Sequence, residues 1–306
     1  MDLLYTYNKL NDTFPKRLVF HLGCDGGFFS EYNNMILVML YCLRRQLRFT
    51  LYSQDAGFGF GRGWNDYFLP FCPEDNNPLH SFFNMRFPHK YPLFLRMMDM
   101  FRKSLRNACL TSDVFHSART MDIREDICIP ELGLSGDLRT VCRRLIEMTW
   151  RYNSETAQRI RTVVTDLNLP AQYLGLHIRG GDKFIETERL DIAVYMDKAA
   201  QITDIRSAFV LTDDYRVIES LCETYLDWDF YTLCDESEKG YYNKRFRKEK
   251  ASVRRHKMIN LFASMDILAE AEAFVGTFSS NPGMYLGMRR TSGQTFSVDI
   301  PEWKIW

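Results

Sequence analysis

The chain opens with a pattern typical of a strand, a tight turn and a helix. A short apolar run over residues 17–22 ends at a glycine cluster, Gly23-Cys24-Asp25-Gly26-Gly27, and apolar residues then recur at helical spacing over residues 28–47. Glycines allow the sharp turn that such a junction needs, so this order predicts a strand followed by a helix. Residues 48–52 predict the next strand.

The middle of the chain is less regular. Prolines and aromatic residues alternate without a period over residues 70–92, which indicates irregular packing, and a helix is predicted over residues 93–105. Residues 135–164 predict one long helix or two. Asn168-Leu169-Pro170 closes this segment, so we expect an N-terminal α/β domain over residues 1–168 and a second domain over residues 169–306.

The second half alternates strand and helix patterns. Strands are predicted over residues 172–178, 207–211 and 273–276 and near Phe230, and helices over residues 191–202, 215–225, 252–271 and 280–288. Such alternation is typical of an α/β fold with a doubly wound parallel sheet, as in a Rossmann-like domain.

Composition narrows the class of protein. The 306 residues are 46% hydrophobic and 25% charged, which is typical of a globular chain with two cores and excludes a disordered or fibrous protein. Lys+Arg and Asp+Glu both number 39, so no global positive field attracts nucleic acid, and we expect no nucleic-acid partner. The apolar run over residues 35–42 is far shorter than the about 20 residues of a transmembrane helix, so none is expected.

The start of the chain and its cysteines bear on the compartment. Residues 1–9 lack the basic and apolar regions of a secretory signal, so we expect a cytoplasmic protein. The 8 cysteines form no CxxC pair, which favours reduced structural thiols.

Polar residues follow three of the predicted strands in the second half. They are the runs of residues 177–183, 212–214 and 277–281. Ligands of parallel sheets bind at the carboxyl ends of the strands. The planar fork of Arg179 suits a diphosphate, and Ser279 and Ser280 at a helix start add hydroxyls and backbone N–H groups. The sequence therefore predicts a nucleotide-diphosphate site without a GxGxxG motif.

Each of these residues also has a purely structural interpretation. His177 would be a hydrogen-bonded core histidine, and Asp213-Asp214 a turn with a helix N-cap. Asp182-Lys183 would be a solvated charge pair, and Ser279-Ser280 would only cap the next helix.

Two further segments have two interpretations each. The glycine-rich stretch of residues 56–64 is either a flexible loop or a place where the backbone approaches a ligand and Phe58 or Phe60 stacks on it. Residues 239–257 hold nine basic residues against the single acidic Glu249. This basic segment is either a solvated face or a lid that an anionic ligand orders.

These motifs together resemble those of the core α1,6-fucosyltransferases and the related bacterial nodulation fucosyltransferases. The resemblance covers roughly residues 20–290. Residues 175–183, with Glu186 and Tyr195-Met196, resemble the family's first motif. Residues 209–214 resemble the second, and Asp266 with residues 274–281 the third. More weakly, residues 23–27, 51–54 and 62–64 resemble its glycine turn, Ser-Gln strand end and Gly-Trp loop. Gly180 stands where the family usually has a second arginine, and Asn281 where it has glutamine.

The resemblance implies a fold and a reaction. It implies a GT-B glycosyltransferase with two Rossmann-like domains facing across a cleft, the N-terminal domain on the acceptor side and the C-terminal domain binding the nucleotide-sugar. The enzyme would invert the anomeric carbon and move fucose from GDP-fucose, or a close GDP-sugar, to an oligosaccharide or glycan acceptor, using no cofactor and no metal. Fixed donors at the leaving diphosphate would stabilise the transition state.

The resemblance also implies roles for single residues. Glu186 would be the base, tuned by Lys183, with Arg179 at the diphosphate and Asp182 beside them. His177 and Asp266 would recognise guanine, Phe58 would lie against the base, and Asp213 and Asp214 would order the neighbouring loop. The implied donor-binding set is His177, Arg179, Asp213, Asp214, Asp266, Ser279, Ser280, Asn281, Gly26, Gly27 and Phe58.

Two alternatives stay open at this point. A GT-A glycosyltransferase would use Asp213 and Asp214 to hold a metal ion under the diphosphate. A nucleotide-sugar or glycan-binding relative without turnover would explain Gly180 in place of the arginine.

Overall fold

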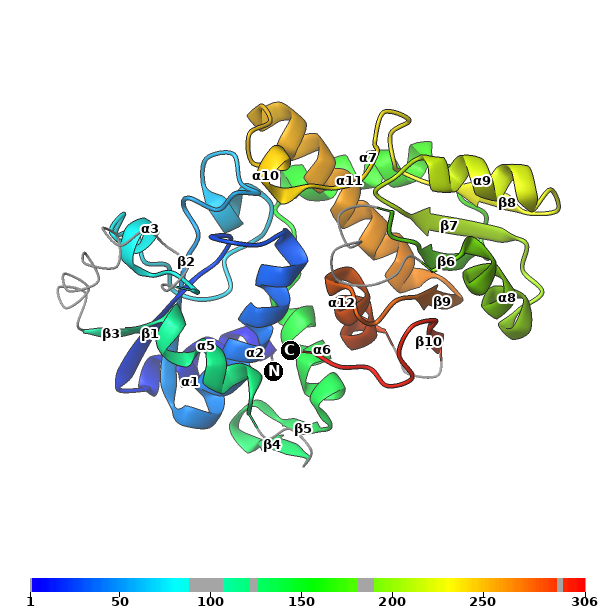
Figure 1. The fold of residues 1–306 in the computed structure, drawn as a ribbon. Coiled ribbons are helices and arrows are strands. Elements are labelled where there is room, and N and C mark those ends of the chain that lie inside the picture. The colour runs from blue at the N-terminus through cyan, green and yellow to red at the C-terminus, as the bar shows by residue number, and fades with distance from the viewer. Residues whose placement is uncertain (1, 88–106, 122–125, 181–189, 291–293, 306) are drawn as a thin grey trace. The chain divides into compact units, whose positions relative to one another are not determined.

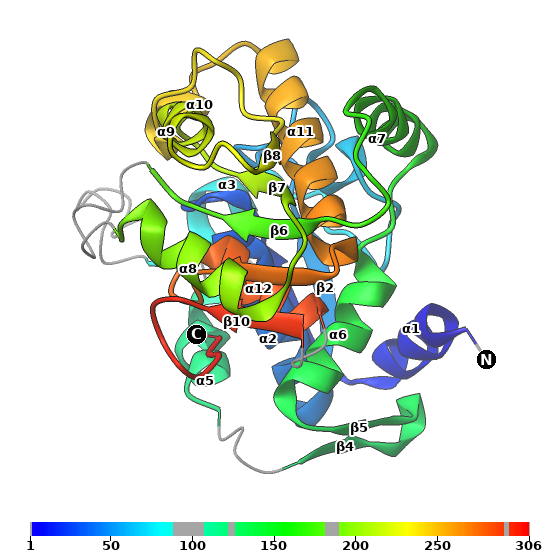
Figure 2. The same ribbon diagram turned by 90° about the vertical axis from the view of Figure 1, so that its right-hand side faces the viewer.

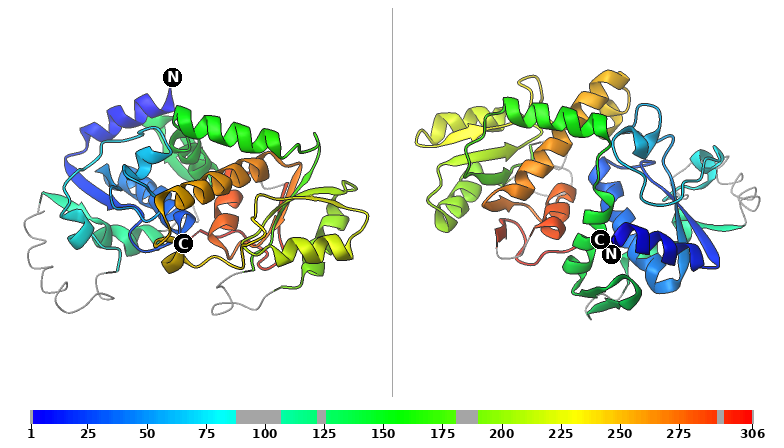
Figure 3. Two further views of the ribbon diagram at one scale, coloured as in Figure 1. Left: turned by 90° about the horizontal axis from the view of Figure 1, so that it is seen from above. Right: turned by 180° about the vertical axis from the view of Figure 1, so that it is seen from behind.

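A computed structural model describes residues 2–87, 107–121, 126–180, 190–290 and 294–305. The chain divides into two compact units: unit 1 is Met1–Asn153 with Ile305–Trp306, and unit 2 is Ser154–Lys304. The division falls earlier than the boundary predicted after residue 168. The reason is that helix α7 (Ser154–Asp166) packs along helix α11 (Ala251–Glu270) of unit 2, as the views of Figure 3 show.

Unit 1 is built on a parallel sheet of three strands. Its first elements are α1 (Leu3–Thr13), β1 (Lys16–His21), α2 (Phe28–Arg45), β2 (Leu47–Tyr52), η1 (Gly63–Asp66), α3 (His80–Phe83), β3 (Ala108–Leu110) and α5 (Thr111–Arg119). The strand order is β2-β1-β3 (Figure 1). The predicted strand, turn and helix at the start of the chain are thus present. The helix predicted over residues 93–105 lies outside the described residues.

The rest of unit 1 is a small hairpin and a helix. These elements are β4 (Ile127–Ile129), η4 (Pro130–Leu132), β5 (Leu134–Gly136) and α6 (Leu138–Thr149). Of the two alternatives for residues 135–164, the structure has two helices, because the chain leaves helical geometry between α6 and α7. The apolar positions that were expected to share one face of α6 are all buried: Leu138, Val141, Leu145 and Met148.

Unit 2 contains a parallel sheet of five strands. Its elements after α7 are β6 (Leu174–His177), α8 (Ile192–Ile202), β7 (Ser207–Leu211), α9 (Arg216–Thr224), β8 (Asp229–Tyr231), α10 (Asn243–Phe246), α11, β9 (Ala273–Gly276), α12 (Asn281–Arg289) and β10 (Thr295–Ser297). Figure 2 shows the strand order β10-β9-β6-β7-β8. The predicted α/β alternation is confirmed. Strand β10, which has 3 residues, was not predicted.

The order of the strands reverses once in each sheet. In unit 2 the chain moves outward from β6 through β7 to β8 and then returns to the other side of β6 with β9 and β10. Because such crossovers are right-handed, α8 and α9 lie on one face and α11 and α12 on the other (Figure 1). The reversal lies between β6 and β9, and open parallel sheets usually bind ligands at the carboxyl ends of strands at such a point. In unit 1 the corresponding reversal lies between β1 and β3.

Two further expectations concern helix length and cysteines. No helix within the described ranges is long and apolar enough to cross a bilayer. All 8 cysteines are free thiols.

Candidate functional site

The carboxyl ends of β6 and β9 meet at His177 and Ser280. The side chain of His177 is buried, and its Nδ1 lies 3.4 Å from the hydroxyl of Ser280. That hydroxyl also caps α12 by accepting from the N–H of Gly283, and it donates to the carbonyl of Thr277. Two predicted site residues that are far apart in the sequence therefore lie at the point of strand reversal, where such sheets bind ligands.

Arg179 and Gly180 lie beside the residues that follow β7. The Nε of Arg179 is 4.0 Å from Oδ2 of Asp213. The N–H of Gly180 donates to Oδ1 of Asp213 at 2.7 Å, and the N–H of Tyr241 donates to Oδ2 at 3.1 Å. Asp213 thus joins the loops after β6, β7 and β8.

Asp214 pairs with a different arginine, Arg216. The Asp214 side chain is fully buried, and the guanidinium of Arg216 donates to both of its oxygens, at 2.8 and 2.5 Å. A carboxylate in such a bidentate pair is poorly placed to ligate a metal ion. Among the described residues, no three His, Cys, Asp or Glu side chains gather as a metal site.

Gly180 is required by close packing. A Cβ at Gly180 would lie 2.4 Å from the Cβ of Asp214, well inside van der Waals contact. A side chain at this position would displace the buried Asp214. This packing accounts for the glycine at a position where the resembled family usually has arginine.

The backbone before α12 is held by a carboxylate that sequence reasoning missed. Asp299 accepts from the N–H groups of Phe278, at 2.9 Å, and Ser279, at 3.1 Å. Its Oδ1 also accepts from the hydroxyl of Ser297. Of the N–H groups that were expected to form part of an anion site, that of Ser279 is therefore already used by Asp299. A short apolar alternation over residues 295–300 is the signal that marks β10 and the strand end where Asp299 lies.

Burial raises the pKa of Asp299, but hydrogen bonds from Ser279, Ser297 and the backbone of Phe278 outweigh it and hold the pKa below its usual value. Because the folded state favours the ionised form, Asp299 stabilises the protein at neutral pH and loses this effect as pH falls below about 4. We expect Asp299→Asn to lower the free energy of unfolding by about 2 kcal/mol at pH 7. Denaturant titrations of both proteins should show this difference shrinking below about pH 4, and a difference that is constant with pH would contradict the assignment.

The remaining predicted residues of unit 2 are distributed as follows. Asp266 on α11 pairs with Arg289 on α12, with Nη1 2.7 Å from Oδ1, and the same nitrogen lies 3.0 Å from the hydroxyl of Tyr285. Asn281 is the first residue of α12 and is half-buried. Asp182, Lys183 and Glu186 lie outside the described residues.

The basic segment, residues 239–257, is partly paired. Lys257 contacts Glu249 at 2.9 Å, and Arg255 pairs with Glu155. Both cations belong to the regular helix α11. The lid hypothesis stays a prediction for the part that precedes this helix.

The glycine turn of unit 1 holds a carboxylate of its own. Glu31, which is 1% exposed, accepts from the N–H of Gly26 at 2.7 Å and from that of Asp25 at 3.3 Å. Arg86 lies 3.4 Å from the same carboxylate. The N–H of Gly26 is therefore used within the turn, and contact of Gly26 with the donor stays a prediction. Gly27 is the N-cap of α2.

Hydrogen bonds within the glycine-rich stretch favour a fixed loop over a flexible one. The buried carboxylate of Asp66 accepts from the N–H groups of residues 60, 61 and 62 at 2.6, 2.9 and 3.0 Å. Gly63 has a φ of +57°, and a Cβ there would lie 1.8 Å from the carbonyl oxygen of Ser53. Phe58 is 4% exposed and packs edge-on against Phe28, so the structure gives it a packing role; contact with a base stays a prediction.

Asp66→Ala is expected to destabilise unit 1 by about 2–3 kcal/mol, because three backbone donors would lose a charged acceptor. Thermal unfolding should show the loss as a lower midpoint. Asp12→Asn, on the exposed side of α1, serves as the control that should leave the midpoint unchanged. Equal midpoints for Asp66→Ala and the control would contradict this account of the loop.

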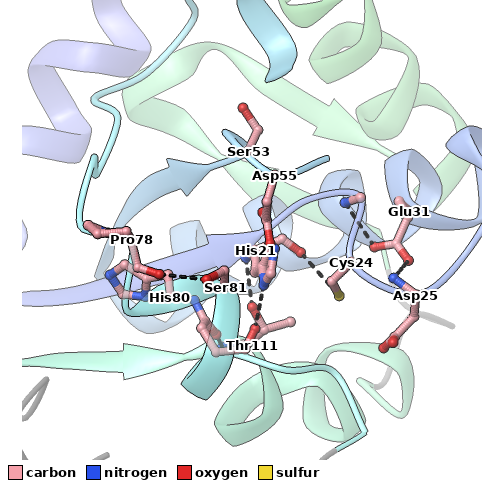
Figure 4. A network of polar contacts seen from close by, with 12 residues as sticks. His21, Cys24, Asp25, Glu31, Ser53, Asp55, Pro78, His80, Ser81 and Thr111 are labelled. Atoms are coloured by element: carbon pink, nitrogen blue, oxygen red, sulfur yellow. Dashed lines mark hydrogen bonds and ion pairs between the residues drawn. The ribbon is translucent and has the colours of Figure 1, made fainter. Parts of the chain in front are cut away.

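A second polar network lies at the carboxyl ends of the unit 1 strands. Figure 4 shows His21, the last residue of β1, between Asp55 and Thr111. Its Nε2 lies 2.8 Å from Oδ1 of Asp55, and its backbone N–H donates to the hydroxyl of Thr111 at 2.8 Å. The rule that ligands bind at the carboxyl ends of parallel strands also points to His21 and Asp55, which follow from β1 and β2 in the same way.

No protein-family model and no curated protein matches the chain. Solved structures do resemble it. The NodZ α1,6-fucosyltransferase co-crystallised with GDP is 12% identical, covers 89% of this chain and 92% of its own, and has a TM-score of 0.51. The fucosyltransferase NodZ from Bradyrhizobium is 13% identical, with coverages of 89% and 93% and a TM-score of 0.51. POFUT1 in complex with GDP is 10% identical, with coverages of 94% and 99% and a TM-score of 0.50. The chain therefore has the GT-B fold of these fucosyltransferases, and the expected fold is confirmed.

Proposed function

We propose that the protein is an inverting glycosyltransferase that transfers fucose, or a close sugar, from a GDP-sugar to a hydroxyl of a glycan, with an α1,6 linkage as the first expectation. The observation that carries the proposal is the meeting of His177 and Ser280 at the strand reversal of unit 2, next to Arg179. The fold supports it, since the NodZ and POFUT1 structures that share the fold contain GDP.

The donor site follows from the chemistry of a sugar diphosphate. When the bond from the sugar to the β-phosphate breaks, negative charge grows on the diphosphate, and fixed positive groups stabilise the transition state. Arg179 supplies a guanidinium, and 23% of its side chain is exposed. The Ser280 hydroxyl and the start of α12 add polar groups on the other side of β6.

The acceptor side needs one base for an inverting displacement. Glu186 is the proposed base, with Lys183 to tune it, and Asp182 completes this set. His177 and Asp266 are the proposed guanine contacts. Asp266 already accepts a hydrogen bond from Arg289. Contact with guanine therefore requires that its carboxylate accept hydrogen bonds from both Arg289 and the base.

A metal-dependent GT-A mechanism through Asp213 and Asp214 is disfavoured by their partners. Asp213 holds backbone N–H groups and faces Arg179, and Asp214 is buried against Arg216. We therefore propose a reaction in which Asp213 and Asp214 hold no metal ion.

Release of GDP from GDP-fucose tests the proposal directly. GDP-fucose, GDP-mannose and UDP-galactose are offered with a panel of core N-glycan, chitin and bacterial polysaccharide acceptors, with and without EDTA. We expect acceptor-dependent GDP release from GDP-fucose that EDTA does not reduce. Loss of turnover with EDTA would favour the metal-dependent enzyme, and GDP binding without turnover on any acceptor would favour a binding protein.

A further inference from the structure

Unit 2 carries a dense patch of positive charge in a chain whose formal charge is zero. The patch lies on α10, on the turn after it and at the start of α11, at the end of α11 that is farther from β9 (Figures 1 and 2). We call five exposed side chains the basic patch: Lys244, Arg245, Arg247, Lys248 and Lys250. Such a cluster creates a local positive field although the whole chain is neutral.

The basic patch stands on a fixed scaffold. The ring of Phe246 is 6% exposed and lies 5.6 Å from the ring of Tyr241. The helical turn continues past the end of α10, because the N–H of Lys248 donates to the carbonyl of Arg245 at 3.0 Å. That of Glu249 likewise donates to the carbonyl of Phe246 at 3.1 Å. With about 3.6 residues per turn, Phe246 lies opposite the face that positions 244, 245, 247 and 248 share, so its burial turns these four cations toward solvent.

The only acidic residue of the basic segment does not neutralise the patch. Oε1 of Glu249 lies 2.9 Å from Nζ of Lys257, and the carbonyl of Glu249 accepts from Nη1 of Arg254 at 2.6 Å. Among the residues that the structure describes, no carboxylate pairs with Lys244, Arg245, Lys248 or Lys250. Cations held this close repel one another, and an anionic surface that covers them relieves the repulsion.

Two uncharged side chains next to the patch indicate which anionic surface fits. Tyr242 is 49% exposed and Val253 is 39% exposed. A tyrosine has an apolar ring and a polar hydroxyl, which suits the headgroup level of a bilayer. Valine offers neither hydrogen bonds nor a stacking face, but it gains from leaving water for the apolar side of the headgroups. Cations combined with such residues are typical of protein faces that lie on anionic bilayers.

The shape of the patch favours a bilayer over an anionic chain. Every residue from Lys250 to Val253 is exposed, so the first turn of α11 projects from the unit. A flat bilayer contacts a projecting surface, whereas a single-stranded nucleic acid is usually bound along a groove. Three of the five cations are lysines, whose flexible stems and compact charges adapt to fluid headgroups, while the fork of arginine matches fixed phosphates and bases.

We infer that the basic patch docks unit 2 on the surface of a bilayer that contains anionic phospholipids, with Tyr242 and Val253 at the headgroup level. The inference goes beyond the proposed function and does not depend on it, because docking involves neither a donor nor an acceptor.

Sedimentation with vesicles tests the inference. The protein without GDP is mixed with phosphatidylcholine vesicles that contain either no anionic lipid or about one-third phosphatidylserine. We expect binding to the anionic vesicles only, and loss of that binding when NaCl is raised from about 0.1 to about 0.5 M. Each cation near an anionic surface contributes about fivefold to the affinity. The patch variant should therefore bind about a hundredfold more weakly or less still; its substitutions are Lys244→Gln, Arg245→Gln, Lys248→Gln and Lys250→Gln.

A control variant removes the same number of exposed cations elsewhere in the chain. Its substitutions, which should leave vesicle binding as in the wild type, are Lys9→Gln, Lys16→Gln, Arg151→Gln and Arg161→Gln. Tyr242→Ser should weaken binding several-fold at every salt concentration, because the contribution of the ring is not electrostatic. Far-ultraviolet circular dichroism shows whether each variant is folded. The single substitution Lys248→Gln, with an expected loss of about fivefold, decides the matter if the patch variant does not fold.

Three results would overturn the inference: no binding of the wild type to the anionic vesicles, equal binding by the patch variant and the wild type, or an equal loss in the control variant. A single-stranded RNA and polygalacturonate are titrated in parallel. If the wild type bound one of these chains through the patch and did not bind the vesicles, the partner would be an anionic polymer and not a bilayer.

Discussion

Replacing Arg290 by methionine should destabilise unit 2 by about 3–5 kcal/mol. The Arg290 side chain is 4% exposed, and its guanidinium donates to the carbonyls of Leu268 and Ala271 at 2.6 Å and of Ala269 at 2.7 Å. These carbonyls lie at the C-terminal end of α11, where a helix has no partners of its own for them and where its dipole favours a cation. Methionine fills a similar volume but leaves the buried carbonyls without donors.

The neighbouring arginine provides the control. Burial lowers the pKa of Arg290 to about 10, so the side chain stays charged at pH 7. Arg289 makes a more exposed pair with Asp266, with side chains 23% and 18% exposed, and Arg289→Met should reduce stability by about 1 kcal/mol or less. Urea unfolding at pH 7, followed by far-ultraviolet circular dichroism, gives both values. Similar losses in the two variants would show that capping of α11 is not what makes Arg290 important.

The part of the fold that follows from local pattern was predictable. In unit 2 each strand is a short apolar run, each helix has a periodic apolar face, and polar residues mark the strand ends. These signals lie within a few residues of one another, so they identified β6, β7 and β9 and the region of His177, Arg179 and Ser280.

The contacts that organise the loops were not predictable in the same way. Glu31 is close in sequence to the turn that it holds, but Asp299 reaches residues 278 and 279 from another strand, and Asn84 reaches His21 from far along the chain. A carboxylate that accepts backbone N–H groups has no residue pattern of its own, because any Asp or Glu that the fold brings near can do so. The glycine clusters therefore gave no indication of Glu31 and Asp66, the internal carboxylates that hold them.

The largest effect on activity is expected from Arg179→Ala. In this variant kcat/KM for transfer from GDP-fucose should fall by about 100-fold or more, because the leaving diphosphate loses a charged, bidentate donor. The Nε of Arg179 lies 4.0 Å from Oδ2 of Asp213, so diphosphate oxygens would compete with this carboxylate for the guanidinium. Because the Arg179 side chain is 23% exposed, the melting temperature should change little. Initial rates of GDP release at several concentrations of GDP-fucose measure the effect.

Two further variants test whether the loss of activity in Arg179→Ala is due to a guanidinium at this position. Arg179→Lys keeps the charge but lacks the planar fork, so it should recover only part of the rate. Arg206→Ala removes another half-exposed arginine of unit 2, which pairs with Asp227 at 3.6 Å on the surface, and it should transfer as the wild type does. If Arg179→Ala turned over like Arg206→Ala, the residues at the end of β6 would not contact the donor diphosphate, and the donor site would have to be sought at another strand end.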